Sequence, residues 1–527
     1  MLNCNVFNHM HARYNNYYPI GFLALLLGYF IYKAAGAPFS DYAGYYFGSR
    51  ELLQGHYQQV YDTYSLNALI AQKGYSGVFV SYTPFPPFTS VVFAPFLLFP
   101  VGISKIVFNA FSATLFLFTI TRAIKYFSIR TWIVWLIPVL FFVPLRNNIF
   151  FGQAYLLLLA LLLEGFMAYK KGKPVLAAVC WGIAIVFKLF PLLIVFYLLT
   201  KKQYIQVLYV GAACLALGVV SVVLNGIDSW QYYVFTIFPR ANSGELNGSY
   251  TYLFQSAFML LKNLFVYDEV QNPQVFFDSP HTFIICMVLF KAAVLAGCVG
   301  ITLYKKTTDL VAFAGWMLAS LLLSPNGSSY SLILLLIPLL AMDGAGNKPV
   351  FYVSIALIFL IGAIPVQAVA QWPLLLQFPR LYLLLLLFVM MLLVTGMRWP
   401  VKPFGLFTGL LLLADAGKLF GQNRDASQYL LREELPLVYG YTVNNNQLVY
   451  YYWDDKGSHA TATGYPVQAF TTDHVRIQNN QVFYYDKQLT ATPDRKKQVM
   501  LINEKEVIYL SDRNRGFGFY ALRIIKP

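Results

Sequence analysis

The chain has 527 residues, of which 58% are hydrophobic and only 12% are charged. Soluble domains carry about 25% charged residues, so this composition excludes a protein whose surface lies mostly in water. The net charge of +15 is explained better by basic cytoplasmic loops touching anionic lipid than by nucleic-acid binding. We therefore predict a multi-pass protein of the lipid bilayer with no nucleic-acid partner.

The first apolar segment covers residues 20–35. The N-terminus lacks the basic start and small-residue cleavage site of a secretory signal. We therefore expect this segment to be retained as the first span, with a cytoplasmic N-terminus. A polar loop rich in Tyr and Gly follows at residues 36–83.

Basic clusters alternate with apolar segments over most of residues 84–418. Such clusters mark cytoplasmic loops, so the segments between them must cross the bilayer in pairs. A long outer loop at 226–280 separates two of the predicted spans, and the last span leads outward. The predicted spans are 131–146, 153–169, 174–187, 189–199, 205–225, 281–304, 309–324, 329–342, 349–370, 379–396 and 403–417.

Residues 84–101 do not fit this alternation. If this segment and 104–121 both crossed, then Arg122, Lys125 and Arg130 would lie outside. The segment also contains five prolines, so we expect it to be interfacial or re-entrant. The predicted total is about 13 transmembrane helices, in an all-α polytopic domain that spans residues 1–418.

Residues 419–527 have a different pattern. Polar and apolar residues alternate with a period of two in Gln447–Trp453, Gln481–Asp486, Glu506–Leu510 and Gly516–Ile525, and Asn-rich turns separate them. These features predict a small β domain, a sandwich or a partial propeller-like sheet, on the extracytoplasmic side.

The polar clusters of the membrane domain share one face, because they all fall at predicted outer helix ends or in outer loops. Polar groups beside apolar walls suit an amphiphilic substrate. Asp41 opens the first outer loop, where a carboxylate is either a base for a hydroxyl group or an ordinary helix cap. The other candidates for substrate binding are Arg50, Tyr82, Asn147, Gln153, Lys188, Arg240, Asn247, His281 and Asn326.

Several of these candidates have two readings. Lys188 lies in the turn Phe187-Lys188-Leu189-Phe190-Pro191, where it either pairs with a phosphate or reaches the lipid headgroups. Arg50 and Arg240 are rival cations in the two outer loops. Gln153 either binds sugar hydroxyls or begins a helix, and His281 is either a substrate contact or an interfacial cap.

Common cofactor and metal motifs are missing from the sequence. It has no Gly-rich phosphate loop, no HExxH, no Ser-His-Asp pattern and no DxD pair outside a turn. We therefore expect no cofactor, no catalytic metal and no nucleotide-linked donor.

Several motifs, taken in order, resemble a known family. Asp41-Tyr42 followed by Leu52-Leu53-Gln54-Gly55, Tyr82-Thr83-Pro84, Phe151-Gly152-Gln153-Ala154 and Lys188 through Pro191 resemble motifs of the polyprenyl-phosphate-mannose-dependent mannosyltransferases. These are GT-C glycosyltransferases that include the phosphatidylinositol-mannoside mannosyltransferases. Asn247-Gly248-Ser249 and Ser324-Pro325 resemble weaker later motifs, so the resemblance covers about residues 20–345.

The resemblance implies an inverting transfer of a hexose or pentose from a polyprenyl monophosphate to a hydroxyl of a lipid or envelope glycan. It implies a bacterial plasma-membrane enzyme with Asp41 as general base. Two departures stand out: Tyr155 replaces the Asn of the family's Gly-Gln-x-Asn motif, and the C-terminal β domain is not a usual family part.

Two other functions are compatible with a polytopic chain. A transporter or flippase for a lipid-linked saccharide is the first, although the sequence shows no inverted repeat. The second is a scaffold whose outer domain binds glycan. Because the family-like motifs all precede residue 345, we expect residues 419–527 to recruit an acceptor or partner. The rival view is that this domain packs over the outer loops and completes the site.

Overall fold

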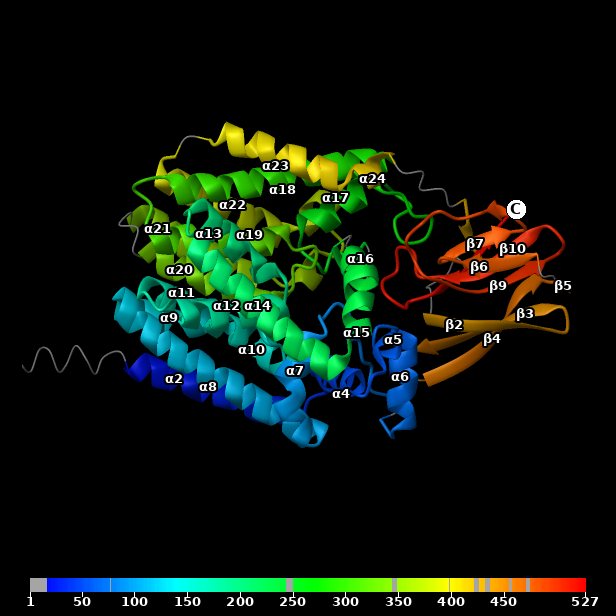
Figure 1. Cartoon of the computed structure of the whole chain (residues 1–527), viewed down its shortest axis with the longest axis horizontal. Helices are drawn as coiled ribbons and strands as arrows, with labels where there is room; N and C mark the ends of the chain where they lie inside the picture. The colour runs from blue at the N-terminus through cyan, green and yellow to red at the C-terminus, as the bar shows by residue number, and fades with distance from the viewer. Residues whose placement is uncertain are drawn as a thin grey trace, which may run out of the picture.

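The computed structural model describes residues 17–527 except 76, 243–249, 344–347, 398, 421–425, 432–436, 455–456 and 471–473. It is 64% helical. Figure 1 shows a helical body with the C-terminal β region at one end. The C-terminal ends of α2, α14 and α23 lie at this same end.

Four helices of the described chain are long and apolar enough to cross a membrane: α2 (Tyr17–Ala35), α8 (Val101–Phe127), α14 (Tyr204–Asn225) and α18 (Pro280–Leu303). A fifth span is possible if α9 (Thr131–Leu140) and α10 (Phe142–Phe151) count as one bent span. The chain is thus a membrane protein, and the count of 13 crossings stays a prediction.

Helix α14 shows most directly why the body needs lipid. Its mean hydropathy is 2.5, yet only 11% of the span is buried inside the protein. Ile205, Leu208 and Val223 are each more than 70% exposed. A contiguous apolar surface of this kind is unfavourable in water, and a bilayer covers it.

The remaining helices of the body are shorter. Those on the chain between α10 and α18 are α11 (Tyr155–Lys170), α12 (Pro174–Phe187), the 3₁₀ turn η3 (Phe190–Leu192) and α13 (Leu193–Thr200). Those after α18 are α19 (Asp309–Leu323), η5 (Ser329–Leu335), α20 (Leu336–Asp343), α21 (Lys348–Ala363), η6 (Val366–Val369), η7 (Leu374–Gln377), α22 (Pro379–Thr395), α23 (Val401–Ala414) and α24 (Ala416–Phe420).

Two predicted spans differ in detail. The expected helix over 131–146 is broken at Phe141, with a bend of 57° between α9 and α10. Pro144 explains the break, because a proline ring clashes with the carbonyl four residues earlier, here Leu140. Residues 84–101 contain α7 (Phe88–Phe93), η2 (Ala94–Leu98) and the first residue of α8, Val101. The structure has other apolar helices of similar length, and the interfacial or re-entrant placement of this segment stays a prediction.

The two outer loops fold into short helices at the end of the body. The first loop contains α3 (Asp41–Ala43), the π-helix η1 (Gly44–Gly48), α4 (Ser49–Leu53), α5 (Tyr57–Val60) and α6 (Thr63–Gln72). The second contains α15 (Ile227–Tyr232), η4 (Tyr233–Ile237), α16 (Phe238–Asn242) and α17 (Ala257–Phe265).

The C-terminal region is a β domain of three antiparallel sheets, in the orders β1-β11-β10-β9-β5, β2-β3-β4 and β6-β7-β8. Three of the four predicted strands are confirmed, and the fourth begins at Ala521 because Gly516 and Gly518 have positive φ. The strands are β1 (Gln428–Tyr429), β2 (Leu437–Asn444), β3 (Gln447–Asp454), β4 (Gly457–Pro466), β5 (Ala469–Phe470), β6 (Val475–Gln478), β7 (Gln481–Tyr484), β8 (Lys487–Gln488), β9 (Lys496–Ile502), β10 (Glu506–Ser511) and β11 (Ala521–Ile525).

The β domain is docked on both outer loops. Buried Asp62 of the first loop accepts hydrogen bonds from Arg495 Nη1 at 3.2 Å and Lys497 Nζ at 2.8 Å. Arg240 of the second loop donates to both carboxylate oxygens of Asp512, at 2.8 and 3.1 Å, and both residues are buried. Charged groups buried without partners are costly, so these pairs hold the domain in one position.

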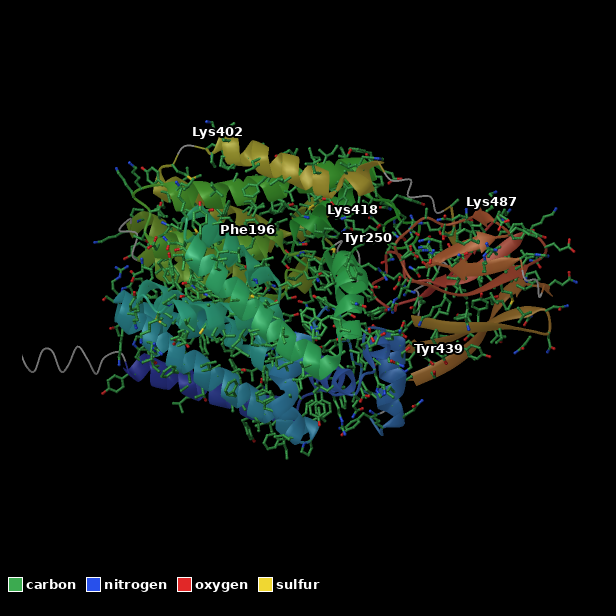
Figure 2. All side chains as sticks on the ribbon, viewed as in Figure 1. Phe196, Tyr250, Lys402, Lys418, Tyr439 and Lys487 are labelled. Carbon is green, nitrogen blue, oxygen red and sulfur yellow. The ribbon has the colours of Figure 1, made fainter. Side chains whose placement is uncertain are left out.

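Aromatic contacts continue this interface. Tyr64 of α6 stacks on Tyr439 of β2 with ring centroids 4.1 Å apart. Figure 2 shows Tyr439 at the edge of the β domain that faces the helical body. The ring centroid of Phe79 lies 5.8 Å from that of Trp453 and 6.1 Å from that of Phe519.

Candidate active site

Asp41 stands at the start of α3, six residues after the end of the first span. Its carboxylate Oδ2 accepts a hydrogen bond of 2.6 Å from Gln153 Nε2. Gln153 Oε1 in turn accepts from Tyr45 OH at 2.9 Å and from Lys188 Nζ at 3.5 Å. One buried amide therefore joins a carboxylate, a phenol and an ammonium that are far apart in the sequence.

The backbone at Gly152 places Gln153 there. Gly152 ends α10 with φ 66°, in the left-handed conformation that glycine adopts most easily. A Cβ at this position would lie 2.6 Å from Cβ of Tyr42. The absence of a side chain lets α10 approach the Asp41 helix closely enough for the hydrogen bond from Gln153.

A second glycine, Gly44, lets the C-terminal end of the first outer loop, at Ser81, pack close to Asp41 and Gln153. A Cβ on Gly44 would lie 2.2 Å from the carbonyl oxygen of Ser81. Tyr45, the next residue, has its ring between Phe85 and Phe93, at centroid distances of 4.4 and 4.5 Å. This stacking fixes the Tyr45 hydroxyl against Gln153.

Lys188 lies just beyond the C-terminus of α12, and its half-buried side chain reaches inward. Its ammonium is 4.2 Å from the ring centroid of Tyr155, 5.1 Å from that of Phe85 and 5.7 Å from that of Tyr45. Aromatic faces attract a cation, so the ammonium is held between rings and beside Gln153.

These groups share a cavity of about 310 Å³, which we call the Lys188 cavity. Asp41 and Lys188 are the two charged residues among the described residues of its wall, and most of the others are aromatic, proline or small polar residues. Asn326 is one of them. Its buried Oδ1 accepts no hydrogen bond from any described residue, and such an atom is satisfied by a ligand or water.

Partial removal of water shifts the pKa values of both Asp41 and Lys188. Asp41 is exposed to the cavity, but the surrounding protein removes much of its hydration, and this raises the pKa of its carboxyl above the ordinary value; Gln153 and Lys188 oppose the rise. Desolvation lowers the pKa of Lys188 to about 7, with Asp41 opposing. A desolvated carboxylate is a stronger base and a desolvated cation a stronger electrostatic partner for phosphate.

Asp41 also lines a second, larger cavity of about 1020 Å³, which we call the Arg515 cavity. Its wall combines Phe39 and Phe151 of the body with Gln271 of the second outer loop and with Arg515 of the β domain. Asp41 and Ser81 belong to both walls. The carboxylate thus stands where the two cavities meet.

The structure brings together four of the ten residues that the sequence predicts, namely Asp41, Gln153, Lys188 and Asn326. Tyr82 is fully buried and donates to the Pro86 carbonyl at 3.3 Å, so it supports the cavity wall from behind. Asn147 donates to Ser329 Oγ at 2.8 Å and ties α10 to η5.

The other four predicted residues lie elsewhere or are not described. Arg50 is exposed on α4. Arg240 contacts the β domain through Asp512. His281 is exposed, and its Nε2 donates to the Leu419 carbonyl at 3.0 Å. Asn247 lies outside the described residues, as does the rest of Asn247-Gly248-Ser249.

Sequence reasoning missed several lining groups. In the sequence Tyr155 is only a departure from the Gly-Gln-x-Asn motif. In the structure its ring makes a cation–π contact with the Lys188 ammonium. Arg515 and Phe519 come from the β domain, which no motif connected to Asp41. Their one signal in the sequence is the Arg-Gly-Phe-Gly-Phe turn at 515–519.

Residues 82–325 match the family model of glycosyltransferase family 87, which is of the GT-C type. The match covers a little under half of the chain. It includes Gln153 and Lys188 but neither Asp41 nor the β domain. No curated protein matches the chain. The family match indicates a glycosyltransferase, and hence a sugar donor and an acceptor.

Proposed function

We propose that this glycosyltransferase moves a hexose or pentose, mannose-like in the first instance, from a polyprenyl monophosphate to a hydroxyl of a lipid or envelope glycan. The reaction takes place at the extracytoplasmic face of a bacterial plasma membrane. The observation that carries the proposal is the pair Asp41 and Lys188, joined through Gln153 in one cavity.

Each group has a definite task in this reaction. Asp41 accepts the proton of the acceptor hydroxyl while that oxygen attacks C1 of the donor sugar. The bond between C1 and the phosphate oxygen breaks, and its electron pair stays on the phosphate. Lys188 neutralises the charge that develops there, and Asn326 hydrogen-bonds the sugar.

The proposed displacement is inverting. Attack from the Asp41 side, with departure toward Lys188, places the incoming and leaving oxygens on opposite faces of C1. No nucleotide and no metal enters this scheme, because the ammonium and the polyprenyl phosphate supply the cation and the leaving group.

The donor class can be tested directly. The purified protein in liposomes is given farnesyl phosphate carrying a radiolabelled hexose or pentose, together with membrane lipid extract as acceptor. We expect labelled glycolipid or glycan in the presence of EDTA, and no product from the matching nucleotide sugars. Product from nucleotide sugars alone would contradict the donor class. Movement of the intact labelled lipid across the bilayer, without product, would favour a flippase.

A further inference from the structure

The Arg515 cavity is built by parts of the chain that meet only when the β domain is docked. Residues 37–40, between the first span and Asp41, form one side, and Phe79 and Ser81 of the first outer loop form another. Arg515 and Phe519 of the β domain complete the wall. The Lys188 cavity, in contrast, is lined only by residues between Asp41 and Tyr330.

The turn that carries Arg515 and Phe519 is fixed against the first outer loop. Thr63 Oγ1 donates to the Phe517 carbonyl at 2.8 Å. Gly518 has φ 72°, and a Cβ there would lie 2.7 Å from the backbone nitrogen of Thr63. Such close backbone packing on α6 holds the neighbouring side chains at the cavity wall.

The Arg515 and Phe519 side chains are also positioned within the turn. Arg515 Nη1 donates to the Tyr520 carbonyl at 2.9 Å, and the residue lines the Arg515 cavity. Phe519 packs beside Phe79, with centroids 6.1 Å apart, and Phe79 stacks on Trp453.

We propose that the β domain forms one wall of the acceptor site, and that Phe519 and Arg515 bind the saccharide of the acceptor and select it. This inference rests on the proposed function, because it takes Asp41 as the base that separates a donor cavity from an acceptor cavity. In this proposal the β domain is part of the acceptor-binding site itself, and not only a module that recruits the acceptor.

The chemistry of the wall points to a saccharide. Phe39, Phe79 and Phe519 offer flat apolar surfaces for the C–H faces of sugar rings. Arg515 brings a positive charge to the wall, which attracts hydroxyl or carboxylate oxygens. Gln271 offers its acceptor oxygen Oε1 to sugar hydroxyls, because its Nε2 already donates to Tyr429 OH and to the Asn514 carbonyl. The volume of about 1020 Å³ is at the upper end of ligand pockets, so several sugar units fit, with the reacting hydroxyl at Asp41.

The test uses the full-length protein, farnesyl phosphate with a radiolabelled hexose as donor, and a set of octyl glycosides and octyl diglycosides as acceptors. Two rates are measured: transfer to the glycoside, and slow donor hydrolysis to water, which needs no acceptor. We expect Phe519→Ala and Arg515→Gln each to raise the acceptor KM about tenfold, to leave donor hydrolysis within twofold of wild type, and to shift acceptor preference. Phe519→Tyr should restore most of the affinity.

Arg476→Gln is the matched control, because Arg476 is an exposed arginine of the same domain that lines neither cavity. It should leave both rates unchanged. An acceptor KM within twofold of wild type in Phe519→Ala and Arg515→Gln would overturn the proposal. So would an equal loss of donor hydrolysis, because it would indicate a structural role. Donor hydrolysis without transfer to any glycoside would exclude the saccharide class, whereas a wild-type protein inactive in both assays would instead contradict the proposed function.

Discussion

Lys188 lies at a helix end, where a lysine usually reaches the lipid headgroups, yet here its ammonium lies inside a cavity between three aromatic rings. We predict that Lys188→Ala raises the donor Kd about 10- to 100-fold, the range of a hydrogen bond to a charged group. Lys188→Arg should restore part of the affinity. Binding of a farnesyl phosphate sugar by the purified protein measures this.

Lys33 is the control for this substitution. It lies near the C-terminal end of α2, close to the rings of Tyr29 and Tyr32, and lines neither cavity. Lys33→Ala should not change the donor Kd. If Lys188→Ala kept its affinity but melted at lower temperature, Lys188 would be a structural residue.

The pH dependence of kcat/KM follows from the same two groups. Asp41 must be ionised, and its raised pKa places the acid limb above pH 3.8. Lys188 must be protonated, and its lowered pKa places the alkaline limb near pH 7. We predict a bell-shaped profile that reports the free protein. In Lys188→Arg the alkaline limb should move to higher pH, since arginine stays charged. If the alkaline limb stays near the same pH in this variant, a group other than Lys188 causes it.

At the scale of single residues, sequence reasoning found the polar groups better than it found their surroundings. Asp41, Gln153, Lys188 and Asn326 could be chosen because each is a polar residue at a predicted outer helix end. Arg240 fits that rule equally well, but it pairs with Asp512, 272 positions later in the chain. No local pattern distinguishes a buried ion pair from a ligand site.

At the scale of secondary-structure elements, the close approach of α10 to α3 decides the geometry around Asp41. We predict that Gly152→Ala lowers transfer at least tenfold, because its Cβ would push against Tyr42 and displace Gln153. Gly172→Ala is the matched control. Gly172 also has a left-handed backbone, φ 67°, but no atom lies within 4 Å of its Cβ.

Both alanine variants pay a backbone cost of about 1–2 kcal/mol, and so both should melt at lower temperature. Transfer rates at equal folded fraction therefore isolate the Tyr42 contact. Equal activity of the two variants would show that Gly152 is needed only for its left-handed backbone conformation and not for the close approach to Tyr42.

Helix boundaries were predictable where the apolar run is long and uninterrupted, as in α14 and α18. The break at Phe141 was not foreseen, although Pro138 and Pro144 were visible, because proline within an apolar run is compatible with either a kink or a break. The π-helix at Gly44–Gly48 was equally invisible, since it depends on contact with Ser81 and Tyr82.

At the scale of the whole molecule, the predicted orientation puts both cavities and the β domain outside the cell. It can be tested in a variant whose five native cysteines are replaced. Lys173→Cys, between α11 and α12, should be protected from an impermeant thiol reagent in intact cells. Lys487→Cys, on the β domain (Figure 2), should be labelled. Labelling at both positions, or at Lys173→Cys alone, would contradict the orientation.

The presence of a C-terminal β domain was predictable from its alternating pattern and turns, but its docking was not. The contacts that place it are Asp62 with Arg495 and Lys497, and Arg240 with Asp512. They join positions more than 270 residues apart, and they help to hold Arg515 and Phe519 at the wall of the Arg515 cavity. The rival view from the sequence, in which the domain packs over the outer loops, describes this arrangement.

The central claim, that Asp41 is the base of a sugar transfer from a polyprenyl phosphate, is tested most directly by Asp41→Asn. The measurement is the initial rate of label transfer from a farnesyl phosphate sugar, with Asp228→Asn, an exposed carboxylate of the second outer loop, as control. We predict that Asp41→Asn keeps its fold and its donor affinity and loses about 10²- to 10⁴-fold in rate, while Asp228→Asn matches wild type. A rate above about a tenth of wild type in Asp41→Asn would contradict the claim.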